Sequence, residues 1–148
     1  MKTLLCALLL GFGQPTIPAQ PTALLQGFMR DVISQQLNDT ELENKYLCPT
    51  QLQQQSVAGD KARIIVGKYL SLLRTQLNEQ KVNPEEIVFT PFDSLPAKPF
   101  EIIGGSQQVY AVQYRCEDIF YFLVEENKIS SFYLINQDGQ AYFVTFCR

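Results

Sequence analysis

The strongest constraint on the fold is a change of hydrophobic periodicity near the middle of the chain. Up to about residue 80, apolar side chains recur at intervals of three and four residues, which is typical of amphipathic helices. After Asn83-Pro84 they form short runs separated by turn-forming pairs, which is typical of strands. This order predicts an α+β domain, in which N-terminal helices pack on a C-terminal antiparallel sheet of four to six strands.

Local signals define the helical half in more detail. Thr40 with Glu43, and Thr50 with Gln53, have the spacing of a capping box, and Asp60 is a suitable N-cap for a long helix. The wide apolar stripe of that helix indicates that it is largely buried. The expected helices are 22–38, 40–47, 50–57 and 60–80.

The second half is expected to form a meander. Turns are predicted at Glu117-Asp118, Asn127-Lys128 and Asp138-Gly139, of which the last is the most specific, because a tight hairpin requires positive φ there. Glu86–Thr90 and Phe100–Ile103 are two shorter candidates that precede it. The strands of the meander are then 109–116, 119–126, 129–136 and 141–147.

This layout, together with the run Glu126-Asn127-Lys128-Ile129, resembles the nuclear transport factor 2-like (cystatin-like) superfamily. The Asn-Lys-Ile turn is similar to the Gly-Lys-Ile hairpin that those domains often carry. The resemblance covers nearly all of residues 20–148 and implies a cone-like roll, in which the helices pack on a curved antiparallel sheet. Because the superfamily includes enzymes, binding modules and subunits of complexes, the resemblance does not assign a function.

The resemblance also implies a pocket between the helices and the concave sheet. Tyr110, Tyr114 and Arg115 are the best polar candidates to line it. The chain has no histidine, and pairs such as Glu117-Asp118 point to opposite faces of a strand, so they cannot form a facing acid-base dyad. We therefore predict no catalytic residue, no cofactor and no metal site.

Aromatic side chains are concentrated in residues 109–148, which hold ten of the seventeen in the chain. They occupy both parities of the expected strands, whereas the helices can cover only one face of the sheet. A homodimer, a protein partner or an apolar small molecule is expected to cover the other face. The alternative is that strand twist and extra loops bury both faces within one chain. The candidate interface residues are Phe120, Phe122, Phe132, Tyr133 and Phe143.

The N-terminus has the pattern of a secretory signal. Lys2 precedes an apolar run from Leu4 to Phe12, which is too short to cross a bilayer, and Ala19 follows as a cleavage position. Cys6 leaves a lipoprotein as an alternative. We predict a signal peptide over 1–19, a single secreted or periplasmic domain over 20–148, and no integral membrane segment in the mature chain.

Export predicts a disulfide among the cysteines that remain. In a meander, Cys116 and Cys147 end strands at opposite edges, and a seven-residue strand is about 23 Å long, well beyond the limit of about 7 Å between bridged Cα atoms. Cys48 should therefore be one partner in any bridge. Pairing with Cys116 or with Cys147 remains open, with Cys116 slightly favoured, while free thiols would contradict the export signal.

The charge balance limits the possible partners. With 15 acidic and 12 basic residues the chain is not expected to bind nucleic acid, since such proteins carry a basic patch. The leading hypothesis is an exported, non-catalytic domain that binds an apolar ligand or a protein through its aromatic sheet. The alternatives are a small enzyme of the polyketide-cyclase or isomerase kind, and an accessory or chaperone-like subunit of a surface or secretion complex.

Overall fold

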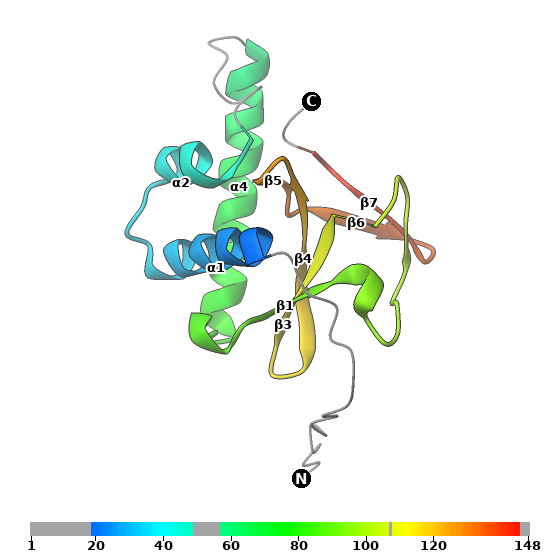
Figure 1. Cartoon of the computed structure of the whole chain (residues 1–148). Coiled ribbons are helices and arrows are strands. Elements are labelled where there is room, and N and C mark those ends of the chain that lie inside the picture. The colour runs from blue at the N-terminus through cyan, green and yellow to red at the C-terminus, as the bar shows by residue number, and fades with distance from the viewer. Residues whose placement is uncertain (1–18, 49–56, 107, 146–148) are drawn as a thin grey trace.

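The computed structural model describes residues 19–48, 57–106 and 108–145 (Figure 1). The helices lie on one side of the molecule and the strands on the other. The expected signal segment lies outside the described residues except for Ala19, and so does nearly all of the expected helix 50–57. The α+β class and the order of helices before strands are confirmed.

Three helices expected from the sequence are present with shifted ends. The helix expected over 22–38 is α1 (Ala19–Ser34), that over 40–47 is α2 (Asp39–Tyr46), and the long helix is α4 (Val57–Glu79). Two single turns of 3-10 helix, η1 (Pro84–Glu86) and η2 (Phe92–Ser94), flank the first strand.

The strands form two sheets, so the expectation of one continuous sheet is wrong. The first sheet is antiparallel and has the order β1 (Val88–Pro91), β3 (Val109–Tyr114), β4 (Glu117–Glu125), β5 (Lys128–Ser131). In the second sheet β7 (Gln140–Phe143) lies between β2 (Glu101–Ile102), which is parallel to it, and β6 (Leu134–Gln137), which is antiparallel.

The break between the sheets falls inside the strand expected over 129–136. The Ser131 hydroxyl donates a hydrogen bond to the Val144 carbonyl at 2.6 Å and accepts one from the Tyr133 N–H at 3.1 Å. The Ser131 side chain thus links the end of β5, where Ser131 pairs with Leu123, to the chain after β7, and the chain passes from β5 into β6 of the other sheet.

Two of the three expected hairpin turns lie elsewhere. The β3–β4 turn is Arg115-Cys116, and the β4–β5 turn is Glu126-Asn127, all four residues having positive φ. Glu117-Asp118 instead begins β4, where Glu117 pairs with Tyr114. The Asp138-Gly139 turn is confirmed, with φ of 53° and 80°. All three loops have two residues, and their left-handed backbone matches the twist of the strands that they join.

The helix caps are also shifted in sequence from the expected positions. The capping box of α2 joins Asn38 and Glu41, each side chain accepting a hydrogen bond from the backbone N–H of the other. The box is therefore two residues earlier than the Thr40–Glu43 pair. Asp60 lies in the first turn of α4 and pairs with Arg63 at 2.5 Å, because the helix begins at Val57.

The main core lies between the helices and the first sheet. Phe28 of α1 is fully buried at its centre, with its ring 5.5 Å from that of Tyr46, 5.6 Å from Phe122 and 5.8 Å from Phe132. These rings fill the space between α1, α2 and the first sheet.

A second cluster covers the opposite face of the first sheet. Val109, Ala111, Tyr121 and Leu123, on β3 and β4, pack against side chains of the chain segment between β1 and β3 and of β7. The chain therefore covers this face itself, and the expectation that it is left for a partner is wrong. The covering residues are Phe92, Leu95, Phe100, Ile102 and Phe143.

Helix α4 is less buried than its wide apolar stripe predicted. The face that enters the core carries Val66, Leu70, Leu73 and Leu77. Three further apolar residues on other faces of the helix are exposed: Ile64, Ile65 and Leu72, at 72%, 46% and 55%.

Among the described residues, no helix combines the length and hydrophobicity needed to span a bilayer.

Candidate functional site

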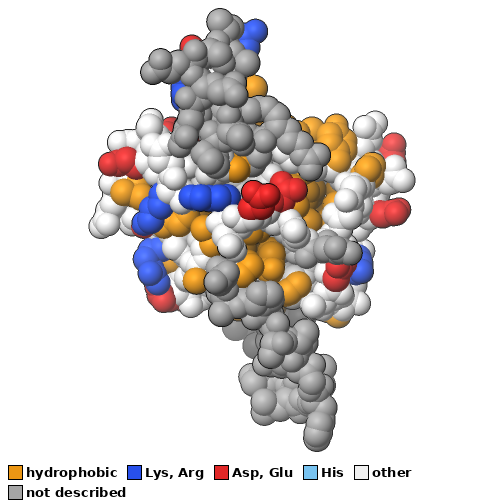
Figure 2. All heavy atoms as spheres, turned by 45° about the horizontal axis from the view of Figure 1, so that its top comes forward, with side chains coloured by type: hydrophobic (Ala, Val, Ile, Leu, Met, Phe, Trp, Pro, Cys, Tyr) orange, Lys and Arg blue, Asp and Glu red, His pale blue; other side chains and the backbone are white. Residues whose placement is uncertain are grey.

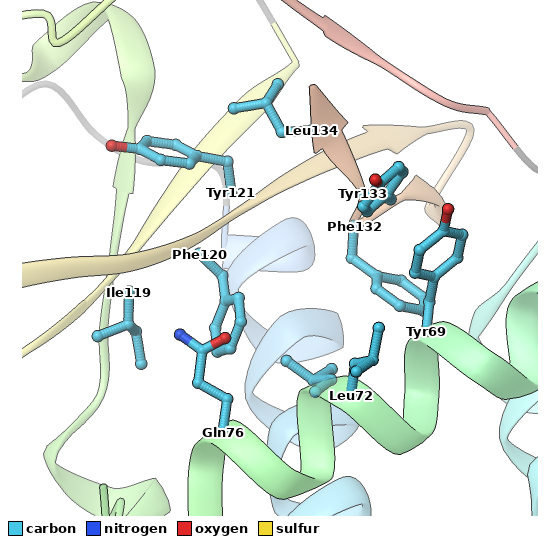
Figure 3. A pocket seen from close by; sticks show the side chains of 10 residues that line it. Tyr69, Leu72, Gln76, Ile119, Phe120, Tyr121, Phe132, Tyr133 and Leu134 are labelled. Carbon is cyan, nitrogen blue, oxygen red and sulfur yellow. The ribbon is translucent and has the colours of Figure 1, made fainter. Parts of the chain in front are cut away.

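An apolar groove of about 290 Å³ separates α4 from the first half of β4 and from the connection between β5 and β6 (Figure 3). We call it the α4–β4 groove. Its walls come from segments that are distant in the sequence. The described residues that line it are Tyr69, Leu72, Leu73, Gln76, Ile119, Phe120, Tyr121, Phe132, Tyr133 and Leu134.

One flank of α4 forms the helical wall. Tyr69, Leu72 and Gln76 recur at intervals of three and four, so they follow one another along the same side of the helix. Leu73 closes the base of this wall, because it belongs to the buried face of α4. The groove therefore begins at the core and opens along the exposed apolar side of the helix.

Two stacked tyrosines close one end of the groove. The ring centroids of Tyr69 and Tyr133 are 3.9 Å apart and the ring planes are inclined at 22°. Burial, and then the neighbouring Tyr133 hydroxyl, raise the pKa of the Tyr69 phenol, which stays neutral at physiological pH. Ser131 holds the backbone N–H of Tyr133 and so fixes this ring against the helix.

The opposite wall consists of three consecutive β4 residues, Ile119, Phe120 and Tyr121. The Tyr121 hydroxyl donates to Asp118 Oδ2 at 2.9 Å, and Gln113 Nε2 donates to the other oxygen of that carboxylate at 2.8 Å. Burial first, and this hydrogen bond second, raise the pKa of Tyr121 far above its usual range. The network therefore fixes the end of β4 without placing a carboxylate in the groove.

Apolar and neutral polar groups line the groove. Its described lining side chains are aliphatic, aromatic or neutral amide groups, with phenol hydroxyls and the Gln76 amide as the polar atoms. No carboxylate, amine, guanidinium or thiol is among them. The groove can therefore bury apolar surface and offer a few hydrogen bonds, but it has no group poised for proton transfer at neutral pH.

The residues predicted to line a pocket lie away from the groove. Tyr110 and Tyr114 are buried in the main core, where burial raises the pKa of Tyr110 and the Tyr114 hydroxyl donates to the Lys81 carbonyl at 3.3 Å. Arg115 is in the exposed β3–β4 turn, its guanidinium 4.9 Å from the Tyr114 ring centroid. They contribute to packing at this end of the sheet, so the structure does not unite them with the α4–β4 groove.

The five candidate interface residues have three different positions. Phe122 is fully buried by this chain and offers no surface to a partner, while Phe132 is 8% exposed. Phe143 packs in the second cluster. Phe120, Phe132 and Tyr133 line the α4–β4 groove, which gives these aromatic residues a shared site that strand periodicity alone did not reveal.

One apolar row does remain open, on the outer face of the second sheet. Ile135 pairs with Tyr142, and the β2–β7 register brings Ile103 beside Tyr142. Ile103 and Tyr142 are 56% and 42% exposed. Figure 2 shows more generally that hydrophobic side chains reach the surface among charged ones on one face of the molecule. This row is smaller than the aromatic face that the sequence predicted.

The two cysteines of the predicted bridge lie toward opposite ends of β4. Cys116 directly precedes the strand, whereas Cys48 follows Leu47, which bridges Ile129 opposite the end of β4. The two cysteines are therefore about 25 Å apart along the strand direction. The Cα atoms of a disulfide lie within about 7 Å of each other. This arrangement favours the Cys48–Cys147 alternative, which stays a prediction because Cys147 lies outside the described residues. Neither Cys48 nor Cys116 is a free thiol.

Within the described ranges, no three histidine, cysteine, aspartate or glutamate side chains come together as a metal site. The chain matches no protein-family model, and no curated protein or solved structure is significantly similar to it. The resemblance to the nuclear transport factor 2-like superfamily therefore stays a prediction.

Proposed function

We propose that this chain is an exported, non-catalytic binding domain whose binding site is the α4–β4 groove. One observation carries the proposal: a concave apolar cavity, closed at one end by the stacked Tyr69 and Tyr133 rings, opens beside an exposed apolar stripe of α4. Removing apolar surface from water is favourable, so an apolar ligand that displaces water from this cavity is stabilised there.

The size of the groove limits what it holds. Its volume of about 290 Å³ is at the lower end of the range of about 300–1,000 Å³ typical of ligand sites. The tyrosine hydroxyls and the Gln76 amide supply hydrogen bonds at its two ends. The site thus suits one small apolar or aromatic group, with a polar atom at its edge.

Export is the part of the proposal that the sequence supports. Residues 1–19 have the charge and hydrophobicity pattern of a secretory signal, and they lie outside the described residues apart from Ala19. Cleavage after Ala19 would leave α1 almost complete, because that helix begins at Ala19. A secreted or periplasmic location follows from this pattern.

The enzyme alternative is less well supported by the site. A cyclase or isomerase of the polyketide kind needs a general acid or base within reach of the substrate. The carboxylate nearest to the groove in the Tyr121 network is that of Asp118, an exposed residue outside the lining. The groove is therefore better suited to binding than to proton transfer.

Titration with N-phenyl-1-naphthylamine, an uncharged dye that fluoresces in apolar sites, tests the binding proposal. We expect saturable binding that Leu72→Gln weakens about tenfold, because a leucine side chain contributes about 1.5 kcal/mol or more when buried. Ile64→Gln is the matched control, since Ile64 is an exposed apolar residue of the same helix outside the groove. Equal effects of the two variants, or no saturable binding, would contradict the proposal.

A further inference from the structure

Three consecutive residues of β4 line the groove, which locates the groove relative to the strand. Side chains of successive strand residues point to opposite faces of a sheet. Ile119 is a bulge residue and packs with Phe120 against the main core, whereas Tyr121 packs in the second cluster on the opposite face. A cavity bordered by both Phe120 and Tyr121 therefore lies along the edge of the strand. The groove is an edge site, not a pocket on one face.

The pairing of β4 explains why that edge is open. On one side, β4 pairs with β3 along its length, with a bulge at Ile119. On the other side, β5 pairs only with Leu123, Val124 and Glu125, and the chain then leaves for the second sheet. In the described part of the chain, no strand pairs with this side of β4 along Ile119–Phe122.

An open edge has unpaired backbone N–H and C=O groups, and another polypeptide strand can satisfy them. We propose that the α4–β4 groove takes an extended polypeptide segment of a partner protein, which pairs with β4 along the partly exposed residues Ile119–Tyr121. One apolar side chain of the segment enters the groove between β4 and α4, in keeping with the groove volume of about 290 Å³. This inference depends on the proposed function, because it names the partner of the same site.

Positive charge on α4, beyond the Tyr69–Tyr133 end of the groove, indicates the chemistry of the partner segment. Lys61 and Lys68 follow the same side of α4 as Ile65 and Leu72. Both lysines are exposed, and neither forms an ion pair with a described residue. A segment that is apolar where it enters the groove and acidic beside it would complement this wall.

A second copy of this chain fits the edge less well. The open side of β4 lies between α4 and the β5–β6 connection, which both line the groove. The same edge of a second folded copy would be recessed behind its own α4, so the two edges could not approach to strand-pairing distance, about 4.8 Å. A single extended segment meets no such obstruction.

The probe for this inference is an acetylated, amidated nonapeptide in which valine and threonine alternate between terminal glutamates. Two matched peptides carry N-methyl groups on all valines or on all threonines. Since N–H groups of alternate residues point to opposite edges of a strand, each set of methyl groups blocks one edge only. Displacement of N-phenyl-1-naphthylamine from the purified protein gives the affinities, and amide hydrogen exchange reports on Ile119–Tyr121.

We expect the parent peptide to displace the dye, one methylated peptide to bind at least tenfold more weakly, and the other to bind within twofold of the parent. New exchange protection should appear along Ile119–Tyr121, and glutamine in place of the two glutamates should weaken binding severalfold. Equal binding of all three peptides, or binding without this protection, would overturn strand addition.

Two other results separate this inference from the proposed function. If the dye binds in the groove and the parent peptide does not displace it, the site takes small apolar molecules and the inference is wrong. If the dye itself shows no saturable binding, the proposed function fails, and the inference that depends on it fails too.

Discussion

A Cβ atom built onto Gly27 of α1 would lie 3.1 Å from the hydroxyl oxygen of Tyr46 on α2. That hydroxyl donates a 2.5 Å hydrogen bond to Asp31, and the Tyr46 ring meets Phe28 edge to face. The absence of a side chain at residue 27 therefore lets the two helices approach closely enough for the tyrosine to contact both the core and a carboxylate.

Gly27→Ala tests this close approach, with Gly67→Ala as its control. Alanine in a helix interior is favoured over glycine by about 1 kcal/mol. At Gly67 the nearest atom to an added Cβ is Asp39 Oδ2 at 3.5 Å, an ordinary contact, so the control should stabilise the protein. At Gly27 the Tyr46 ring must move, at a cost of about 1–3 kcal/mol. Urea unfolding should therefore show Gly27→Ala less stable than Gly67→Ala, and equal gains would contradict the packing.

Asp31 gives a pH-dependent contribution to stability. Burial raises its pKa, but hydrogen bonds from Lys45 and Tyr46 outweigh burial and hold the pKa below its usual value. The same contact raises the pKa of Lys45 to about 12. A depressed carboxyl pKa stabilises the fold above the unfolded-state value of about 3.9, and this contribution is lost as the pH falls through the folded pKa.

We expect Asp31→Asn to lower the free energy of unfolding at pH 7 by about 1.5–3 kcal/mol, the range for a hydrogen bond to a charged group. The difference from wild type should shrink as urea titrations are taken from pH 5 to pH 2.5. Asp60→Asn, which removes an exposed ion pair with Arg63, should have the smaller effect. A loss for Asp31→Asn that is independent of pH would show that the charge of Asp31 is unimportant.

The contribution of Glu43 to stability should depend on pH in the opposite direction to that of Asp31. It is 7% exposed, and burial first, then the charge of Asp39, raise the pKa of its carboxyl group. A raised pKa means that the contribution of this group is full below the unfolded-state value, about 4.3, and is lost as the pH rises through the folded pKa.

Glu43→Gln should therefore stabilise the protein at pH 7, by about 1 kcal/mol, and have little effect near pH 3.5. Denaturant unfolding at the two pH values measures this, with Glu101→Gln as a control at an exposed position. A destabilised Glu43→Gln protein at pH 7 would mean that the charged carboxylate has a favourable role in the fold.

The sequence predicted the elements better than their contacts. The α4 periodicity identified a helix, but Ile64, Ile65 and Leu72 were as apolar as the residues that enter the core, so the pattern could not choose the buried face. The Arg115-Cys116 turn contains neither glycine nor asparagine, and pairing between Tyr114 and Glu117 determines it. Local signals do not carry this information, because long-range packing decides between alternatives that are locally similar.

Local sequence signals could not predict which residues form the groove either. Tyr69 and Tyr133 are adjacent only because Ser131 ends β5 and turns the chain toward α4. Phe120 and Tyr133 were singled out by their aromatic character, but as part of an open sheet face. The useful signal was the apolar excess itself: α4 and β4 both had more large apolar residues than one core-facing stripe needs.

The cysteine arrangement gives the last prediction. Because Cys48 and Cys116 lie at levels of the sheet about 25 Å apart, we expect peptide mapping of the unreduced protein to find Cys48 linked to Cys147 and not to Cys116. A bridge between Cys48 and Cys147 would close a loop of about 100 residues. In the loop-entropy model, such a bridge stabilises a fold by about 4–5 kcal/mol. Cys48→Ser should then lower the free energy of unfolding by a similar amount under oxidising conditions and have little effect on the reduced protein. Recovery of a peptide joining Cys48 to Cys116 would contradict the strand arrangement and, with it, the open edge of β4.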